Sequence, residues 1–123
     1  MHPVTFKPNG DPLKINIQYL GAFTASYIYT LWEANSNAQV SQLSGNNLNS
    51  QDDVYPLPCP VAANTGRIIE VFSTLKNSTG ASMIGIVEVT VSQGSTVLAT
   101  ISEQETLGAG ATVINDMFIN LIQ

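Results

Sequence analysis

The stretch SMIGIVEVTVSQGSTVLATIS, residues 82–102, decides the fold of this chain. Apolar and polar side chains alternate on both sides of its centre, which is the period of a β-strand with one buried face. The alternating apolar residues are Val87, Val89, Val91, Val97, Ala99 and Ile101. Gln93-Gly94 lies between the two runs, and glycine supplies the positive φ that a two-residue hairpin turn needs. The stretch therefore predicts a β-hairpin, although Leu98 interrupts the alternation of its second strand.

Similar runs occur in the rest of the second half of the chain. β-Branched residues are concentrated at 67–75, 82–92, 95–102 and 112–121, and glycine-rich or polar turns separate these runs. Such spacing is typical of all-β domains. We therefore predict an antiparallel β-sandwich of seven or eight strands, jelly-roll or immunoglobulin-like, with a small closed β-barrel as the alternative.

The C-terminal run is ambiguous between helix and strand. Within residues 114–122 the apolar positions fit one face of a helix, and a different subset of them fits the alternation of a strand. We predict a strand, because the β-branched residues 112–114 come directly after a Gly-Ala-Gly-Ala turn.

The first half of the chain is predicted to supply the aromatic centre of the domain. Residues 14–19 alternate as a half-buried strand, whereas residues 23–32 carry apolar side chains on both parities, which predicts a central strand covered on both faces. Residues 1–13 contain three prolines and an Asn-Gly pair, so we expect an extended N-terminal arm that ends in a tight turn. The length of the chain fits a single domain, 1–123.

Prolines mark the segment that follows residue 54. In residues 55–61 proline occupies every even position, so the missing N–H groups would all lie along one edge of an extended strand. We interpret this segment as an edge strand that cannot template further pairing. A polyproline-II connector is an equal alternative, because prolines extend the chain either way.

Charged side chains are scarce in this chain. They make up 11% of its residues, against about 25% in an average domain, and the net charge is −5. A negative chain with four cations repels phosphate backbones and anionic lipid, so we expect no nucleic-acid partner and no membrane insertion. Polar residues interrupt the most apolar stretch, 19–32, and no signal peptide is visible at the N-terminus. We expect a soluble protein and assign no compartment.

The residues needed for common catalytic sites are missing. His2 is the only histidine, and we expect it in a mobile arm, far from any nucleophile. Cys59 is the only cysteine, so it forms no intramolecular disulfide, and we interpret it as a small buried apolar residue. Glu103 and Glu105 share a strand face, but we interpret them as a solvated strand end. We therefore predict that the chain is not an enzyme and assign no catalytic residue.

Residues 34–53 are predicted to form a long loop rich in amides. Its oxygen-bearing side chains, together with an aromatic residue just before it, form the predicted ligand-binding set: Trp32, Asn46, Asn47, Asn49, Asp52 and Asp53. Carboxylate and amide oxygens are ligands that calcium accepts, although the spacing matches no EF-hand loop. We predict no cofactor, commit to no metal ligand, and keep calcium as an alternative at this loop. For Trp32 the alternative is packing in the core. A short edge strand around residues 39–43 would shorten the loop.

Two functions follow from these observations. A surface with little charge, a proline-protected edge and a projecting arm favour a non-catalytic protein interaction or assembly module, with a homo-oligomer or another protein as partner. The alternative is a lectin-type carbohydrate-binding module, calcium-dependent or not, that uses the 34–53 loop. Asn77-Ser78-Thr79 matches an N-glycosylation acceptor, and we interpret it as turn chemistry.

Overall fold

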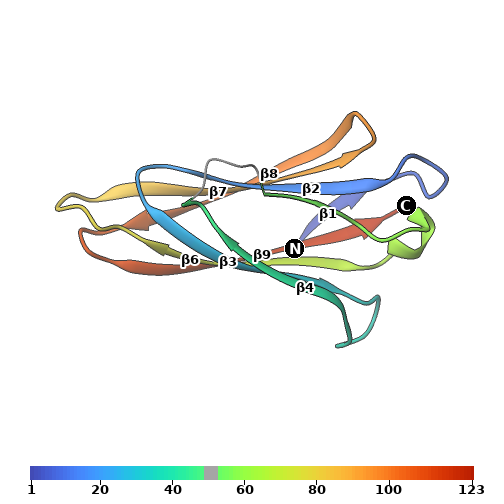
Figure 1. Cartoon of the computed structure of the whole chain (residues 1–123), viewed down its shortest axis with the longest axis horizontal. Coiled ribbons are helices and arrows are strands. Elements are labelled where there is room, and N and C mark those ends of the chain that lie inside the picture. The colour runs from blue at the N-terminus through green and yellow to red at the C-terminus, as the bar shows by residue number, and fades with distance from the viewer. Residues whose placement is uncertain (49–52) are drawn as a thin grey trace.

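The computed structural model describes residues 1–48 and 53–123, which form two β-sheets packed face to face (Figure 1). The elements are β1 (His2–Thr5), β2 (Leu13–Leu20), β3 (Thr24–Trp32), β4 (Gln39–Asn46), β5 (Asp53–Pro56), the 3₁₀ helix η1 (Val61–Asn64), β6 (Ile68–Lys76), β7 (Met83–Gln93), β8 (Thr96–Leu107) and β9 (Thr112–Ile122). Sheet A has five strands in the order β1-β9-β6-β3-β4, and sheet B has four in the order β5-β2-β7-β8. The predicted β-sandwich is confirmed, and the sheets do not close into a barrel.

The described residues contain nine strands rather than seven or eight. The prediction undercounts because β1 and β5 are each four residues long and contain proline, which sequence patterns count against a strand. Neighbouring strands are antiparallel except β1, which pairs with β9 in parallel. The finer assignment to a jelly-roll or immunoglobulin-like plan stays a prediction. No helix in the described residues is long and apolar enough to cross a lipid bilayer.

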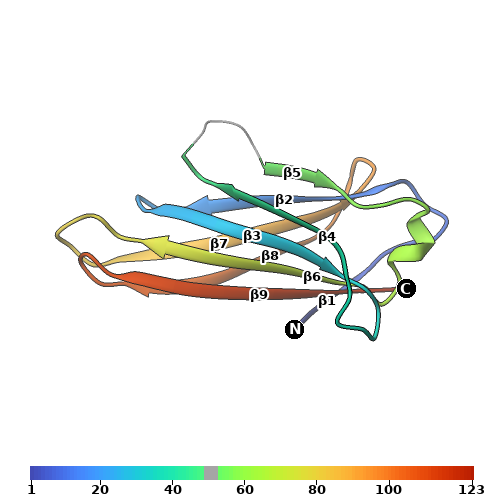
Figure 2. The ribbon, with the colours of Figure 1, turned by 60° about the horizontal axis from the view of Figure 1, so that its bottom comes forward.

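Sheet A lies in front of sheet B in Figure 2. Alternate side chains of both sheets fill the space between the two layers. This core includes Leu13, Ile15, Tyr29, Leu31, Ile69, Val71, Leu75, Val87, Val89, Val91, Leu107, Met117, Ile119 and Leu121. In β9 the buried residues are the odd-numbered ones from 115 to 121, which is the period of a strand. The strand predicted for the C-terminus is therefore confirmed.

The predicted hairpin is strands β7 and β8. Gly94 has φ +60° at the turn, as the positive φ of this turn type requires. Val91 pairs with Ala99 and Ser92 pairs with Val97, so Leu98 has no partner of its own and forms a β-bulge. The break in alternation at Leu98 was the sequence signal of this bulge.

The N-terminal arm is part of sheet A. His2 pairs with Ile119 of β9, and the next inward side chain, Val4, is 2% exposed. Phe6 continues the contact, because its N–H donates to the carbonyl oxygen of Ile122 at 2.9 Å. The expectation that His2 lies in a mobile arm is therefore wrong: the apolar residues of the arm are buried against the core.

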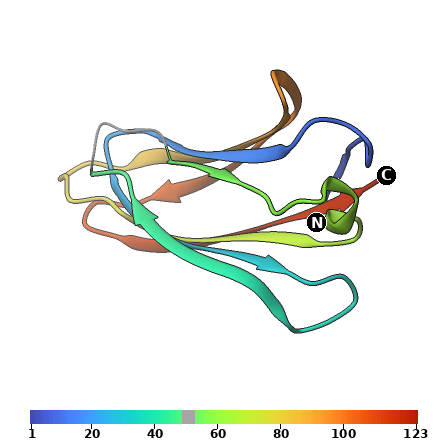
Figure 3. The same cartoon turned by 45° about the vertical axis from the view of Figure 1, so that its right-hand side comes forward.

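Strand β3 is half-buried rather than covered on both faces. Tyr27, Tyr29 and Leu31 point into the core, whereas Ile28 on the opposite face is 44% exposed. Residues 39–43 form the predicted edge strand, which continues as β4 to Asn46. The connection between β3 and β4 stands away from the rest of the sandwich (Figure 3). Apolar residues on both parities therefore marked a strand whose second face carries apolar side chains on the outer surface of sheet A.

The proline segment is an edge strand only over its first residues. β5 pairs with β2 at one edge of sheet B, and the N–H of Leu57 donates to the carbonyl oxygen of Leu13 at 2.9 Å. Beyond Leu57 the chain turns into η1 through a cis peptide bond between Cys59 and Pro60. The edge-strand interpretation is thus confirmed to Pro56 and wrong for the residues after it. Cys59 is exposed, so its interpretation as a buried residue is also wrong.

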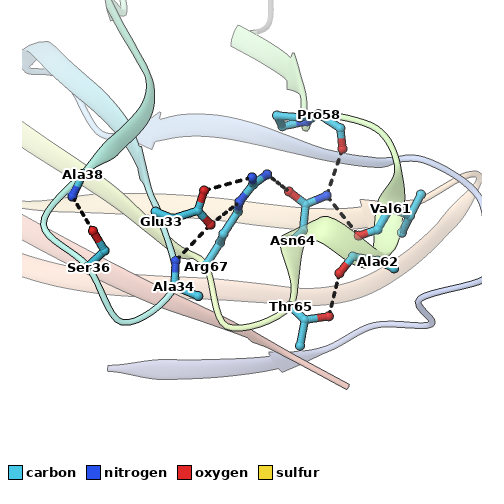
Figure 4. Close-up of polar contacts among 10 residues, drawn as sticks. All are labelled: Glu33, Ala34, Ser36, Ala38, Pro58, Val61, Ala62, Asn64, Thr65 and Arg67. Atoms are coloured by element: carbon cyan, nitrogen blue, oxygen red, sulfur yellow. Dashed lines mark hydrogen bonds and ion pairs between the residues drawn. The ribbon is translucent and has the colours of Figure 1, made fainter.

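A polar network holds η1 against the end of β3 (Figure 4). The Arg67 guanidinium donates to both carboxylate oxygens of Glu33, at 3.1 and 3.2 Å, and to Oδ1 of Asn64 at 3.1 Å. The buried Asn64 amide in turn donates to the carbonyl oxygen of Pro58 at 2.9 Å. The hydrogen bond from Arg67 lowers the pKa of the Glu33 carboxyl, which therefore stays ionised.

Asn77 has a similar structural role at the opposite end of the sandwich. Its fully buried amide nitrogen lies 2.8 to 3.1 Å from the carbonyl oxygens of Ala81, Leu107 and Gly108. Its Oδ1 accepts from the backbone N–H of Thr79 at 2.9 Å. The interpretation of this motif as turn chemistry is confirmed.

The fold predicts that an aspartate substitution lowers the unfolding free energy by very different amounts at two neighbouring positions of β7. Val89 is fully buried, so Val89→Asp places an unpaired carboxylate in the core and should cost about 3 kcal/mol or more of unfolding free energy. The control is Thr90→Asp, one residue further on the outer face, which should change the unfolding free energy by less than about 1 kcal/mol. Urea denaturation measures both. Equal losses for the two variants would contradict the orientation of β7.

Candidate functional site

The outer face of sheet A carries an unusual number of apolar side chains. Because the odd-numbered residues of β3, β6 and β9 point into the core, the even-numbered ones point outward. The outward apolar residues of these three strands are Ile28, Trp32, Ile68, Phe72, Ile114, Phe118 and Ile122. We call this surface the sheet A face. Its central strands thus have apolar residues on both parities, which explains the mixed pattern of residues 23–32.

The outer face of sheet B is polar by comparison. Its central positions are Lys14, Asn16, Gln18, Glu88, Thr90, Thr100, Ser102 and Gln104. Apolar residues on that face gather mainly at one end, where Leu20 pairs with Ile86 beside Ile84. The two faces therefore differ chiefly in their aromatic residues, because Trp32, Phe72 and Phe118 point outward on sheet A and no aromatic residue of the described strands does so on sheet B.

The apolar side chains of the sheet A face are neighbours across strands. Ile28 of β3 pairs with Phe72 of β6, and Ile114 of β9 lies one row further along, opposite Thr74. A second group surrounds Glu70, since Trp32 pairs with Ile68 and Glu70 pairs with Phe118. Ile28 and Ile114 are the most exposed, at 44% and 57%. Contiguous apolar surface of this kind marks interaction sites, whereas single exposed apolar residues are ordinary.

Shallow hollows run along the same face. One of about 400 Å³ lies over β3, β4 and β6, where it is lined by Ser26, Ile28, Asn46, Phe72 and Thr74. A second, of about 320 Å³, shares Ser26, Asn46 and Thr74 with it and continues toward Lys76. The edge of sheet A near β4 thus offers a polar rim of hydroxyls and one amide beside the apolar residues.

A third hollow of about 240 Å³ lies at the Trp32 end of the face, where Trp32, Glu70 and Phe118 line it together with Ser36 and Asn37. The indole Nε1 of Trp32 donates to the Glu70 carboxylate at 2.9 Å, which fixes the orientation of the ring. Trp32 therefore does not pack in the core, contrary to the alternative drawn from its position. It is partly exposed on the outer face.

Two carboxyl groups lie close together in the middle of the face. Partial desolvation and the neighbouring Glu70 carboxylate raise the pKa of Asp116 from its ordinary value of 3.8 to about 7. Lys76 is the only cation on the three central strands of this face and lies at the far end of β6. The carboxyl groups and the cation are therefore separated along the strands, with the carboxyl groups in the middle of the face and Lys76 at one end.

The predicted ligand-binding residues do not converge on one point. Trp32 and Asn46 both belong to the sheet A face, but Asn46 pairs with Ser26, six residues from Trp32 along β3, or about 20 Å. Asn46 Oδ1 accepts from the N–H of Leu48 at 3.0 Å. The Asn47 amide bonds to backbone atoms of β3 and its entry, accepting from the N–H of Ala25 at 2.8 Å.

Asp53 begins β5 in sheet B, where its carboxylate is close to Tyr27. Asn49 and Asp52 lie outside the described residues. Within residues 1–48 and 53–123, no group of three or more His, Cys, Asp or Glu side chains is arranged to hold a metal ion. The calcium alternative therefore gains no support from the described part of this loop.

Glu103 and Glu105 are not at a solvated strand end, as the sequence had suggested. They lie inside β8 and face the seam between the sheets, where the Asn115 amide donates to one carboxylate oxygen of each at 3.1 and 3.0 Å. His2 contacts the other oxygen of Glu103 at 2.6 Å. These contacts tie β1, β8 and β9 together. The parity that Glu103 and Glu105 share with the buried Ile101 was a sequence signal for this inward orientation, but nothing pointed to Asn115.

Comparisons with models of protein families, with curated proteins and with solved structures found no match to this chain. A functional proposal must therefore come from the geometry of the molecule. That geometry offers the sheet A face as the candidate site, because it combines contiguous apolar surface, a polar rim and opposite charges that are separated along the strands.

The raised pKa of the Asp116 carboxyl predicts how the stability of the folded protein depends on pH. Its pKa is higher in the folded state than in the unfolded chain, so the folded state holds this proton more tightly between pH 4 and 7. The stability that it contributes is therefore fully present below pH 4 and is lost as the pH rises through 7. Asp116→Asn removes the titration, and it should be more stable than the parent at pH 8.

Urea denaturation of both proteins at pH 4, 6 and 8 tests this. The difference in unfolding free energy should grow in favour of Asp116→Asn as the pH rises, and the pH 4 pair is the internal control because both side chains are then neutral in the folded state. A difference that is the same at the three pH values would contradict the prediction.

Proposed function

We propose that this chain is a non-catalytic assembly module whose copies associate through the sheet A face. The observation that carries the proposal is the contiguous apolar surface of Ile28, Phe72 and Ile114 across three neighbouring strands. Interface cores are depleted in charge and enriched in aromatic residues, and the composition of this face agrees with that description.

A second copy of the chain is the partner that the charges favour. Lys76 and Glu70 lie on the same outward row of β6, with residue 73 midway between them. A two-fold axis in the plane of the interface that crosses β6 at residue 73 would bring Lys76 of each copy opposite Glu70 of the other. The same operation places Phe72 against Thr74, Ile28 against Ser26, and Ile114 against Asp116. A large side chain thus meets a smaller one, as in sheets that pack closely.

The low overall charge supports self-association further. A net charge of −5 spread over 123 residues gives weak repulsion between copies, and the sheet A face holds a cation among its few charged groups. Lys76 of each copy can therefore offset Glu70 of the other, while Asp116 lies one row from the axis near the centre of the face.

A matched pair of variants tests the face. Ile114 on sheet A and Ile84 on sheet B are both 57% exposed and both lie in strands. Ile114→Asp should halve the number of copies in the assembly, because it places a carboxylate in the proposed interface, whereas Ile84→Asp should leave the mass unchanged. Light scattering coupled to size exclusion measures the mass, and circular dichroism confirms that both variants fold.

Two results would contradict the proposal. One is a parent protein with the monomer mass of 13.1 kDa at every concentration tested. The other is an equal effect of Ile114→Asp and Ile84→Asp on the mass.

Glycan binding is a second candidate because of the hollow beside Trp32. Sugars stack on aromatic rings and bond to carboxylates and amides, and this hollow offers the oriented Trp32 ring, Glu70 and the Asn37 amide. Ser36 and Asn37 come from the 34–53 segment, as the lectin-type prediction requires. In the proposed dimer Glu70 both lines this hollow and faces Lys76 of the other copy, so a bound glycan would compete with that ion pair.

A glycan array with and without calcium tests this second candidate. Glycan binding by the parent that Trp32→Ala abolishes, with the assembly mass unchanged, would establish it. Phe118→Ala, which alters the wall of the hollow but keeps the indole, is the control and should weaken binding less. Absence of binding to every glycan on the array would reject the lectin-type function.

A further inference from the structure

The four edges of the two sheets differ in how they are protected against pairing. β1 is four residues long and contains Pro3, and β5 is equally short and ends at Pro56. β8 carries the bulge at Leu98 and the inward-pointing Glu103 and Glu105. Short edge strands, prolines, bulges and inward charges are the devices by which proteins prevent edges from pairing.

β4 lacks most of these devices. Its sequence, QVSQLSGN, contains no charged residue and no proline over eight residues. Its register with β3 shifts between Leu31 and Trp32, which leaves Val40 as an extra residue at the start of the strand. From residue 41 to Asn46 the pairing with β3 is regular, so six residues present an unprotected edge.

The hydrogen bonds to β3 identify which groups of β4 are free. The N–H of Asn47 donates to the carbonyl oxygen of Ala25 at 3.1 Å, so the N–H groups of Gly45 and Leu43 also point toward β3. The N–H and C=O groups of Gln42 and Ser44 therefore point away from the sheet. Among residues 1–48 and 53–123, no other strand of sheet A lies on that side.

We propose that this edge pairs with the same edge of a second copy, with the two β4 strands antiparallel about a two-fold axis at Leu43. In this register Gln42 of each copy exchanges hydrogen bonds with Ser44 of the other, which uses the free groups. Leu43, which is 46% exposed, then lies beside Leu43 of the second copy. No like charges are opposed, because β4 has none.

This second interface goes beyond the sheet A face and does not depend on it. The edge axis is perpendicular to the sheet, whereas the axis proposed for the face lies in the interface plane. The row of Leu43 reaches β6 at Val71, whereas the face axis crosses β6 at residue 73, so the two axes are perpendicular but do not meet. The two interfaces therefore act as separate contacts and do not define a closed assembly of four copies.

Two edge variants separate the interfaces. Leu43→Lys opposes two like charges at the edge axis, and its side chain points away from the sheet A face. Ser44→Pro removes an N–H that faces solvent and leaves the bonds to β3 in place. Each should lower the mass measured by light scattering to that of the dimer held by the sheet A face, and combining Leu43→Lys with Ile114→Asp should give the 13.1 kDa monomer. Leu43→Gln, which adds no charge, is the matched control and should keep the parent mass.

Hydrogen exchange measured by NMR gives a readout that does not depend on mass. The amides of Gln42 and Ser44 should exchange slowly in the parent and at least tenfold faster in Leu43→Lys. The edge proposal is wrong if both folded edge variants keep the parent mass and the Gln42 amide exchanges as slowly in them as in the parent. That result would not bear on the proposal for the sheet A face. If the edge variants halve the mass of the assembly and Ile114→Asp keeps the parent mass, the result supports the β4 edge interface and contradicts the interface at the sheet A face.

Discussion

The constraint on which the rest of this structure depends is the alternation of side chains along each strand at a fixed register. In sheet A the odd-numbered residues of β3, β6 and β9 fill the core, so the register also decides what is exposed. A slip of one residue would exchange Val71 for Phe72 and bury a carboxyl group in place of Met117. The same alternation that builds the core therefore builds the sheet A face, and neither can change without the other.

Local sequence patterns predicted most strands and turns correctly. They did not predict which distant strands contact one another. The β7–β8 hairpin, the bulge at Leu98 and the C-terminal strand all follow from alternation and turn residues within about twenty positions. The short parallel strand β1 depends on partners in β9 more than a hundred residues away. Asn115 is near Glu103 and Glu105 in the sequence, but its contacts to them run from one sheet to the other, which no local pattern marks. For the site, the sequence led to Trp32 and Asn46, but the face that holds both became visible only once sheet order was known.

The scarcity of charge has consequences at both proposed interfaces. Proteins usually use charged side chains to keep sheet faces and edges from associating, and this chain has few charged residues. Two of its carboxylates, Glu103 and Glu105, lie at one seam between the two sheets, where they keep the edge strand β8 from pairing. At the opposite seam, burial keeps the tyrosines neutral by raising the pKa of Tyr27, whose hydroxyl bonds to Tyr55. The sheet A face and the β4 edge are left with hydroxyls, amides and apolar groups, which resist association least.

Isotope-filtered NMR on a mixture of labelled and unlabelled chains tests the central claim, that copies meet through the sheet A face, most directly. Association through the sheet A face should give contacts between copies from the Phe72 ring to Thr74 and from the Ile28 methyl groups to Ser26, with none from Ile84 on sheet B. Contacts between copies that involve sheet B alone, or no contacts at a concentration where light scattering shows an assembly, would contradict it.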